Sequence, residues 1–159
     1  MTTHLAHSVT RLKRLLPRLR GKRIGVLGDM ILDRYLWGTS SRISPEAPVP
    51  VVDFVGQNDC LGGAGNVAAN IAALGAKVEA FGVLGSDEAG RALQKCLRQA
   101  NIGEKGVFSE AKRLTTVKTR IIAKHHQVAR VDYERREPLR TETKEKLLRM
   151  IFAALKKLI

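Results

Sequence analysis

Aromatic side chains and long apolar runs are both scarce in this sequence, and each absence argues against a class of protein. Phenylalanine, tryptophan and tyrosine make up 4% of the 159 residues, whereas proteins that bind single-stranded nucleic acid stack bases on aromatic rings. No apolar run approaches the ~20 residues of a membrane-spanning helix. The N-terminus is basic and has no continuous apolar segment, which argues against a secretory signal.

Cysteine is scarce as well, which limits the metal and disulfide chemistry that the chain can support. Its two cysteines, Cys60 and Cys96, lie too far apart in sequence for a local metal knuckle. Without a secretion signal, we expect both thiols to be reduced in a cytoplasmic protein. His125 and His126 have no acid or cysteine beside them, and we interpret them as surface residues at a turn rather than as metal ligands.

Acidic residues are outnumbered, and the excess of positive charge lies at the two ends of the chain. The net charge is +13, with +7 in residues 1–23, −3 in residues 24–110 and +9 in residues 111–159. A nucleic-acid-binding module would carry its charge on the recognition element, but the motif-rich centre is mildly acidic. We attribute most of the excess to solvated helix faces and keep a basic nucleic-acid-binding protein as the least favoured alternative.

Apolar periodicity predicts an α/β protein. Strands that alternate with helices favour a largely parallel sheet, and the remaining extended segments are expected to form a smaller, separate sheet. We expect an amphipathic first helix, the unit 1–20, to pack on the body of the protein, with a basic membrane-surface helix as the alternative. The predicted strands are 22–29, 47–55, 77–85, 115–123 and 126–134, and the predicted helices are 7–20, 66–74, 86–103 and 141–159.

A cluster of glycines precedes the second predicted helix and admits two interpretations. Gly63, Gly65 and Ala68 fit the dinucleotide-binding pattern G-x-G-x-x-A,. That pattern needs a strand that runs directly into its first glycine, but the sequence predicts a break over 56–61. It also needs an acidic residue at the end of the next strand, and Glu79 lies early in that strand. The dinucleotide interpretation is therefore the weaker one.

A longer pattern fits better. From Gly62 the chain reads Gly-Gly-Ala-Gly-Asn-Val-Ala, with further glycines at Gly75 and Gly85. This 24-residue stretch resembles the first signature of the ribokinase-like (PfkB) carbohydrate kinases. The segments GDMILDRYLWGTSSRISPEAPVPVV (28–52) and TVKTRIIAKHHQVARVDYE (116–134) are similar to the heptose-7-phosphate kinase module of lipopolysaccharide biosynthesis, which occurs alone or fused in bifunctional ADP-heptose synthases. The resemblance covers about residues 20–159.

The resemblance implies a ribokinase-like, Rossmann-type parallel sheet flanked by helices, with a small β-lid near 36–55 and 115–134. It places the hydroxyl-binding carboxylate of the family at Asp33, in the loop after the first strand, with Asp29 as the second choice. Main-chain N–H groups of Gly62 and Gly63 can approach a sugar ring closely, and Asn66 offers an amide donor and acceptor. Turn capping, a tight turn and a helix cap are the structural alternatives for these residues.

The implied substrate also carries a phosphate. Lys118 and Arg120 lie two residues apart in a predicted strand and share a face, so they are the candidates for binding it. The alternative is a pair of solvated charges on an edge strand. Weaker candidates are Arg42, Gln127 and Arg130. Tyr35 and Trp37 are expected to pack at the hinge of the lid.

The same resemblance implies ATP and Mg²⁺ as cofactors of the complete enzyme and a homodimer formed through the lid strands. The family's catalytic aspartate lies in a Gly-Ala-Gly-Asp string, which this sequence lacks. We therefore expect the chain to be a truncated, N-terminal half of the kinase domain (21–159), with no catalytic, cofactor-binding or metal-binding residue and no activity of its own. A non-catalytic sugar-binding or dimerisation module is the remaining alternative.

Overall fold

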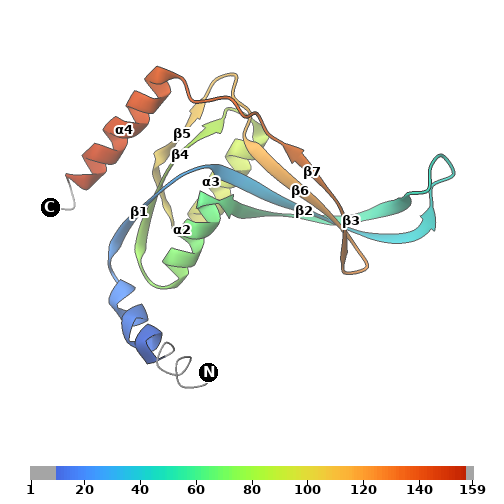
Figure 1. The fold of residues 1–159 in the computed structure, drawn as a ribbon, viewed down its shortest axis with the longest axis horizontal. Coiled ribbons are helices and arrows are strands. Elements are labelled where there is room, and N and C mark those ends of the chain that lie inside the picture. Colours follow the sequence, from blue (N-terminus) through green and yellow to red (C-terminus); the bar gives the residue numbers. More distant parts are fainter. Residues whose placement is uncertain (1–9, 157–159) are drawn as a thin grey trace.

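The computed structural model describes residues 10–156 and contains two β-sheets with helices packed against them (Figure 1). The α/β fold class, with a parallel sheet flanked by helices, is confirmed. The strands are β1 (Arg23–Leu27), β2 (Met30–Ile43), β3 (Pro50–Gly63), β4 (Lys77–Gly85), β5 (Gly103–Glu110), β6 (Thr116–Ala123) and β7 (His126–Tyr133), and the helices are η1 (Leu16–Leu19), α2 (Ala64–Ala73), α3 (Glu88–Gln99) and α4 (Thr141–Leu155).

The parallel sheet, in the order β1-β4-β5, forms the body of the molecule. Val78 and Ala80 of β4 are buried with Ala68 of α2 and with Leu93 and Leu97 of α3 in one apolar core. Because side chains alternate along a strand, Glu79 and Phe81 point to the other face, where they line a groove beneath α4. Burial of apolar surface between the sheet and its helices therefore stabilises this half of the structure.

The second sheet has four strands, in the order β3-β2-β6-β7, and extends away from the body as a long ribbon (Figure 1). β2 and β3, with 14 residues each, form an antiparallel hairpin. β6 runs parallel to β2, and β7 runs antiparallel to β6. The expectation of a smaller second sheet was wrong, because β2 begins immediately after the first strand and continues to Ile43. That this sheet serves as a lid stays a prediction.

The predicted break in the strand before the glycine cluster is not present in the structure. β3 includes residues 56–61 and runs directly to Gly63, where α2 begins. The strand that follows α2 is β4, which lies in the other sheet, whereas the dinucleotide-binding pattern needs the strands before and after its helix to be parallel in one sheet. The dinucleotide interpretation therefore fails because β3 and β4 belong to different sheets and not because a strand is missing.

The N-terminal segment does not pack as predicted. Residues 10–15 are helical and continue into η1, but Leu12, Leu15 and Leu16 are 40–56% exposed. Pro17 has no backbone N–H, which favours the change from α-helix to 3₁₀ geometry at this point. Residues 7–9 of the predicted helix lie outside the described part, and the division of the chain at residue 20 stays a prediction. No helix within residues 10–156 is long and apolar enough to cross a membrane.

A buried hydrogen-bonded node attaches the second sheet to the body. Asp87 caps α3 by accepting a bond from Gly90 N at 2.8 Å, and it also accepts from both the hydroxyl (2.7 Å) and the N–H (2.8 Å) of Thr115. The Thr115 hydroxyl in turn accepts from Gly85 N at 2.9 Å. Burial acts to raise the pKa of Asp87, but the bonds from Thr115 and Gly90 outweigh it and lower that pKa. One carboxylate therefore joins the end of β4, the start of α3 and the segment leading into β6.

Helix α4 buries only part of its predicted apolar stripe. Leu147 is 9% exposed, whereas Leu155 is 48% exposed. Leu148 and Phe152, which lie beside the stripe, are also at least half exposed. Thr143 anchors its first turn by donating to Glu110 of β5 at 2.8 Å. Leu158, the last residue of the stripe, lies outside the described residues. The helix is thus attached to β5 at its first turns and exposes apolar side chains farther along.

Candidate functional site

One face of the four-stranded sheet collects the polar residues that the sequence analysis selected. Asp33 lies opposite Cys60 of β3 and opposite Lys118 of β6, and Tyr35 lies opposite Arg120. Residues paired across strands point to the same side of a sheet. The opposite side carries Leu32 and Val117, which are buried in the same apolar core as Leu93 and Leu97 of α3. We call the exposed side the polar face and define it as Asp33, Tyr35, Trp37, Asn58, Gly62, Lys118, Arg120, Arg130 and Asp132.

Asp33 lies within strand β2 and not in a loop, which corrects the expectation from the sequence. The correction follows from β2 starting at Met30, directly after Asp29. The Oδ1 atom of Asp33 accepts a hydrogen bond from Nη1 of Arg120 at 2.8 Å, and both side chains are about one-fifth exposed. Among residues 10–156, no hydrogen bond to Oδ2 is found. One carboxylate oxygen is therefore fixed and the other is available to a ligand.

Gly62 and Gly63 are adjacent, but glycine is needed at the two positions for different reasons. A Cβ on Gly62 would lie 2.8 Å from Cγ of Asp33, so the absence of a side chain leaves room for that carboxylate. Gly63 has φ of +55°, and a Cβ there would lie 2.5 Å from the carbonyl oxygen of Asp29. A glycine is thus needed at position 62 to make room for the Asp33 side chain, whereas Gly63 is needed for the backbone turn between β3 and α2.

Asn66 and Asp29 flank this turn. Asn66 is the third residue of α2, is exposed, and accepts a weak bond from Asn70 at 3.3 Å. It does not cap the helix, because Gly63 holds the N-cap position. The backbone carbonyl of Asp29 accepts from Ala64 N at 2.9 Å, while its side chain is exposed. The helix-cap alternative for Asn66 is therefore excluded, and Asp29 acts on the turn through its main chain.

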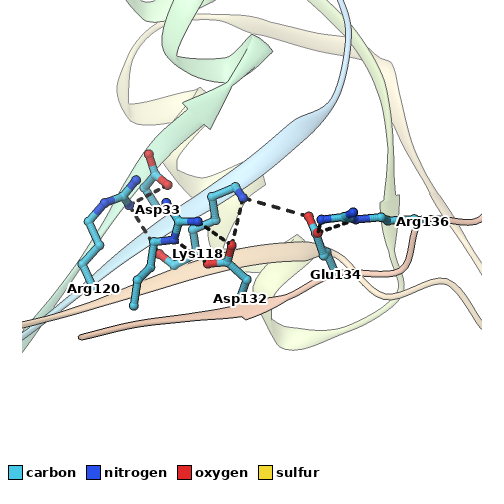
Figure 2. Close-up of polar contacts among 7 residues, drawn as sticks. Asp33, Lys118, Arg120, Asp132, Glu134 and Arg136 are labelled. Carbon is cyan, nitrogen blue, oxygen red and sulfur yellow. Dashed lines mark hydrogen bonds and ion pairs between the residues drawn. The ribbon is translucent and has the colours of Figure 1, made fainter.

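The two predicted phosphate-binding cations already have carboxylate partners (Figure 2). Lys118 Nζ lies 3.2 Å from Asp132 and 4.0 Å from Glu134. Asp132 also accepts two bonds from Arg130, at 2.9 and 3.0 Å. Desolvation acts to raise the pKa of Asp132, but the bonds from Lys118 and Arg130 outweigh it and lower that pKa. Lys118 and Arg120 therefore do not form an open pair of cations, because each is paired with a different acid.

Arg120 and the two aromatic residues form a stack on the polar face. The Arg120 guanidinium carbon lies 5.3 Å from the ring centroid of Tyr35, and the rings of Tyr35 and Trp37 are stacked with centroids 6.0 Å apart. The indole N–H of Trp37 donates to Asn58 at 2.7 Å. The aromatic pair thus lies in the middle of β2, and its role at the hinge of a lid stays a prediction.

Other candidates lie away from this cluster. Arg42 lies at the far end of the hairpin, opposite Val51, and Gln127 lies beside the β6–β7 turn. His125, with φ of +68°, is in that turn and His126 follows it, and both are exposed. Within the described residues, no group of three histidine, cysteine or acidic side chains could hold a metal ion, and Cys60 and Cys96 are free thiols.

Sequence reasoning missed the acids that partner these cations. Asp132 and Glu134 alternate with Arg130 and Arg136 along β7 and its continuation. Arg136 donates to Glu134 at 2.8 Å. Charges of opposite sign two residues apart in a predicted strand share a face, and that pattern was the available signal for this network.

The fold is that of ribokinase-like sugar kinases, and comparisons with known proteins show the family. The family model described as pfkB family carbohydrate kinase matches residues 22–154. The chain belongs to the pfkB family of carbohydrate kinases. Solved structures with the same ribokinase fold include a carbohydrate kinase from Agrobacterium tumefaciens (26% identity, TM-score 0.56, 70% of this chain and 35% of that one). Another is Arabidopsis thaliana ribokinase complexed with ribose and ATP (19%, TM-score 0.55, 72% and 36%).

Among curated proteins, the chain is similar to bifunctional proteins HldE. It is 48% identical over 127 residues to that of Helicobacter pylori strain P12, which covers 80% of this chain. It is 46% identical over 139 residues to that of Geotalea uraniireducens strain Rf4, which covers 87% of this chain. The matches lie in the N-terminal kinase part of these relatives. The chain spans 28% of the length of each of them.

Proposed function

We propose that the polar face binds heptose 7-phosphate, the acceptor of an ATP-dependent kinase reaction at the C1 hydroxyl, in the synthesis of ADP-heptose for lipopolysaccharide core. One observation carries the proposal. The Asp33 carboxylate is held against Gly62, beside the turn into α2, with one oxygen free to accept a hydroxyl hydrogen bond. Similarity to the HldE proteins supports the choice of substrate class.

Groups of the polar face and of the adjoining turn into α2 would contribute different contacts. Asp33 Oδ2 would accept from a sugar hydroxyl, and charge-assisted bonds of this kind are roughly twice as strong as neutral ones. The exposed amide of Asn66 and the main chain at Gly62 and Gly63 would contact neighbouring hydroxyls. Lys118 would bind the substrate phosphate by exchanging Asp132 and Glu134 for the phosphate oxygens, which carry more charge.

Phosphoryl transfer also needs a nucleotide, a metal and a base at the acceptor oxygen. The described residues include no acidic or histidine cluster for Mg²⁺, and the sequence contains no Gly-Ala-Gly-Asp string. We assign none of these residues to the metal or to ATP. We propose that the 159-residue chain by itself orients the sugar phosphate but does not transfer phosphate to it.

Isothermal titration of the chain with heptose 7-phosphate tests this proposal. We expect saturable binding that Asp33→Asn weakens roughly tenfold or more, because a hydrogen bond to a charged group is lost. Asp53→Asn is the matched control, since Asp53 is an exposed carboxylate on the same hairpin, opposite Thr39. Equal affinities of the Asp33 variant and the wild type would remove the site from the polar face.

We also propose that two copies of the chain associate through the far end of the hairpin. Ile43, Val49, Phe54 and Val55 expose 52–69% of their surface there, and an exposed apolar cluster of this kind is typical of an interface. Light scattering after size-exclusion chromatography should report a dimer that Phe54→Ser combined with Val55→Ser converts to a monomer. An unchanged mass in that variant would place any contact elsewhere.

A further inference from the structure

We infer that Arg120 is a positioning residue for the Asp33 carboxylate, and that it does not read the substrate phosphate. The inference deepens the proposed function and rests on it. The sequence analysis grouped Arg120 with Lys118 as a phosphate-binding pair, because the two share one face of a strand. Their partners in the structure separate them, since Arg120 is bonded to Asp33 of β2 and Lys118 to acids of β7 and its continuation (Figure 2).

The contact between Arg120 and Asp33 fixes the orientation of the Asp33 carboxylate. Nη1 lies 2.8 Å from Oδ1, and no bond from Arg120 to Oδ2 is present. The two side chains are 21% and 20% exposed, so water competes for the contact only in part. A charge-assisted bond to one oxygen restrains rotation of the carboxylate. It thereby holds Oδ2 in one direction.

Arg120 is itself restrained and is not a mobile surface cation. Its guanidinium lies over Tyr35, which stacks on Trp37, and Nη1 also lies 3.5 Å from the Lys118 carbonyl oxygen. The hydrogen bond with Asp33 raises the pKa of Arg120, although desolvation opposes it. A planar guanidinium can stack on a ring and donate at its edge at the same time, which a lysine ammonium cannot do.

Gly62 closes the other side of the same carboxylate. A Cβ at Gly62 would lie 2.8 Å from both Cγ and Oδ2 of Asp33. The carboxylate is therefore confined between a glycine of β3 and an arginine of β6. Loss of Arg120 would release it on one side, and sugar binding would suffer whether or not the sugar carries a phosphate.

The test compares two ligands, heptose 7-phosphate and the same heptose without phosphate, titrated by NMR against variants of the whole chain. Arg120→Met should weaken both sugars by the same factor, roughly tenfold or more. Arg120→Lys should weaken both equally but by less, because a charge is kept and the stacked, directed donor is lost. Lys118→Met, the matched control, should weaken only the phosphorylated sugar.

A double-variant cycle separates positioning from a general structural role. If Arg120 acts through Asp33, then Arg120→Met should have little further effect on sugar affinity in the Asp33→Asn background. A full additional loss in that background would overturn the inference, as would a selective loss of the phosphorylated sugar in the Arg120 variants. If Arg120→Met fails to fold, Arg120→Lys in the two backgrounds gives the same comparison.

Failure of the inference and failure of the proposed function give different results. If wild-type chain binds neither sugar, the proposed function is wrong and the role of Arg120 is lost with it. If wild-type chain binds both sugars and Arg120→Lys binds them with unchanged affinity, the proposed function stands and the positioning role is wrong.

Discussion

The body and the ribbon of this molecule are held together by different means. In the body, buried side chains such as Leu84, Leu93 and Leu97 are fully enclosed between the parallel sheet and its helices. In the ribbon, every residue of β7 is exposed, and charged pairs such as Arg34 with Asp59 and Lys118 with Asp132 link neighbouring strands. Apolar burial therefore determines the stability of the body, whereas strand register determines which charges meet in the ribbon.

The largest effect is expected from the core of the body. Leu93→Ala should lower the free energy of unfolding by about 2–5 kcal/mol, because it leaves a cavity beneath α3. Leu12→Ala, a change of the same chemistry at a residue that is 56% exposed, should lie within about 0.5 kcal/mol of the wild type. Urea denaturation measures both, and similar losses in the two variants would contradict the division into buried body and exposed periphery.

The node that joins body and ribbon comes next. Asp87→Ala should cost about 2–3 kcal/mol, because it removes the cap of α3 and leaves the buried Thr115 groups without an acceptor. Urea denaturation with Asp53→Asn as control checks the size of the effect, and a loss no larger than in that control would contradict the account.

The same node predicts a dependence of stability on pH. The pKa of Asp87 is lower in the folded chain than in the unfolded one, so the ionised carboxylate stabilises the fold above its unfolded pKa of about 3.9. That contribution is lost as pH falls through the folded pKa. The stability difference between wild type and Asp87→Asn should therefore shrink between pH 6 and pH 3, and a difference that grows on acidification would be inconsistent with a lowered pKa.

Gly62 and Gly63, at the junction of β3 and α2, are expected to affect different properties of the protein. Gly63→Ala should destabilise the fold by about 1–3 kcal/mol, since φ is positive and Asp29 obstructs a Cβ,. Gly56→Ala, where a Cβ meets nothing within 4 Å, is the control and should change little. Gly62→Ala should instead reduce affinity for the sugar phosphate while the fold persists, because it displaces the Asp33 side chain. Loss of the fold in the Gly62 variant, with Gly63→Ala unaffected, would reverse these assignments.

The smallest effect on stability is expected from the ribbon's exposed charges. Lys118→Ala should change the free energy of unfolding by no more than about 0.5 kcal/mol, because surface ion pairs contribute little. Thermal denaturation at low and high salt checks this expectation. A loss above 2 kcal/mol would show that the Lys118 network supports the ribbon as strongly as burial supports the body.

The sequence predicted elements of both the body and the ribbon, and it missed elements of both for a physical reason. Apolar periodicity located β4 at both of its ends, α2 within two residues of its start, and β6 and β7 within one residue at each end. It missed β5, because GEKGVFSE has only two adjacent apolar side chains among polar ones. It also missed the start of β2, whose Asp33, Arg34 and Tyr35 are polar or amphipathic and are supported by neighbouring strands.

The sequence proposed the residues of the candidate site but not the contacts between them. The resemblance to the family selected Asp33, Gly62 and Gly63, and strand alternation placed Lys118 and Arg120 on one face. The bond from Arg120 to Asp33 joins residues 87 positions apart and depends on the parallel register of β2 and β6. That register is set by tertiary packing, and no local pattern in the sequence specifies it.

The central claim is that the sugar phosphate binds on the polar face and not elsewhere on the molecule. Titration of the isotope-labelled chain with heptose 7-phosphate, followed amide by amide in ¹H–¹⁵N spectra, tests it most directly. The account predicts saturable shifts centred on Asp33, Gly62, Gly63 and Asn66. Shifts confined to the groove between α4 and the parallel sheet, where Phe81 and Met150 lie, or no saturable shifts at all, would contradict it.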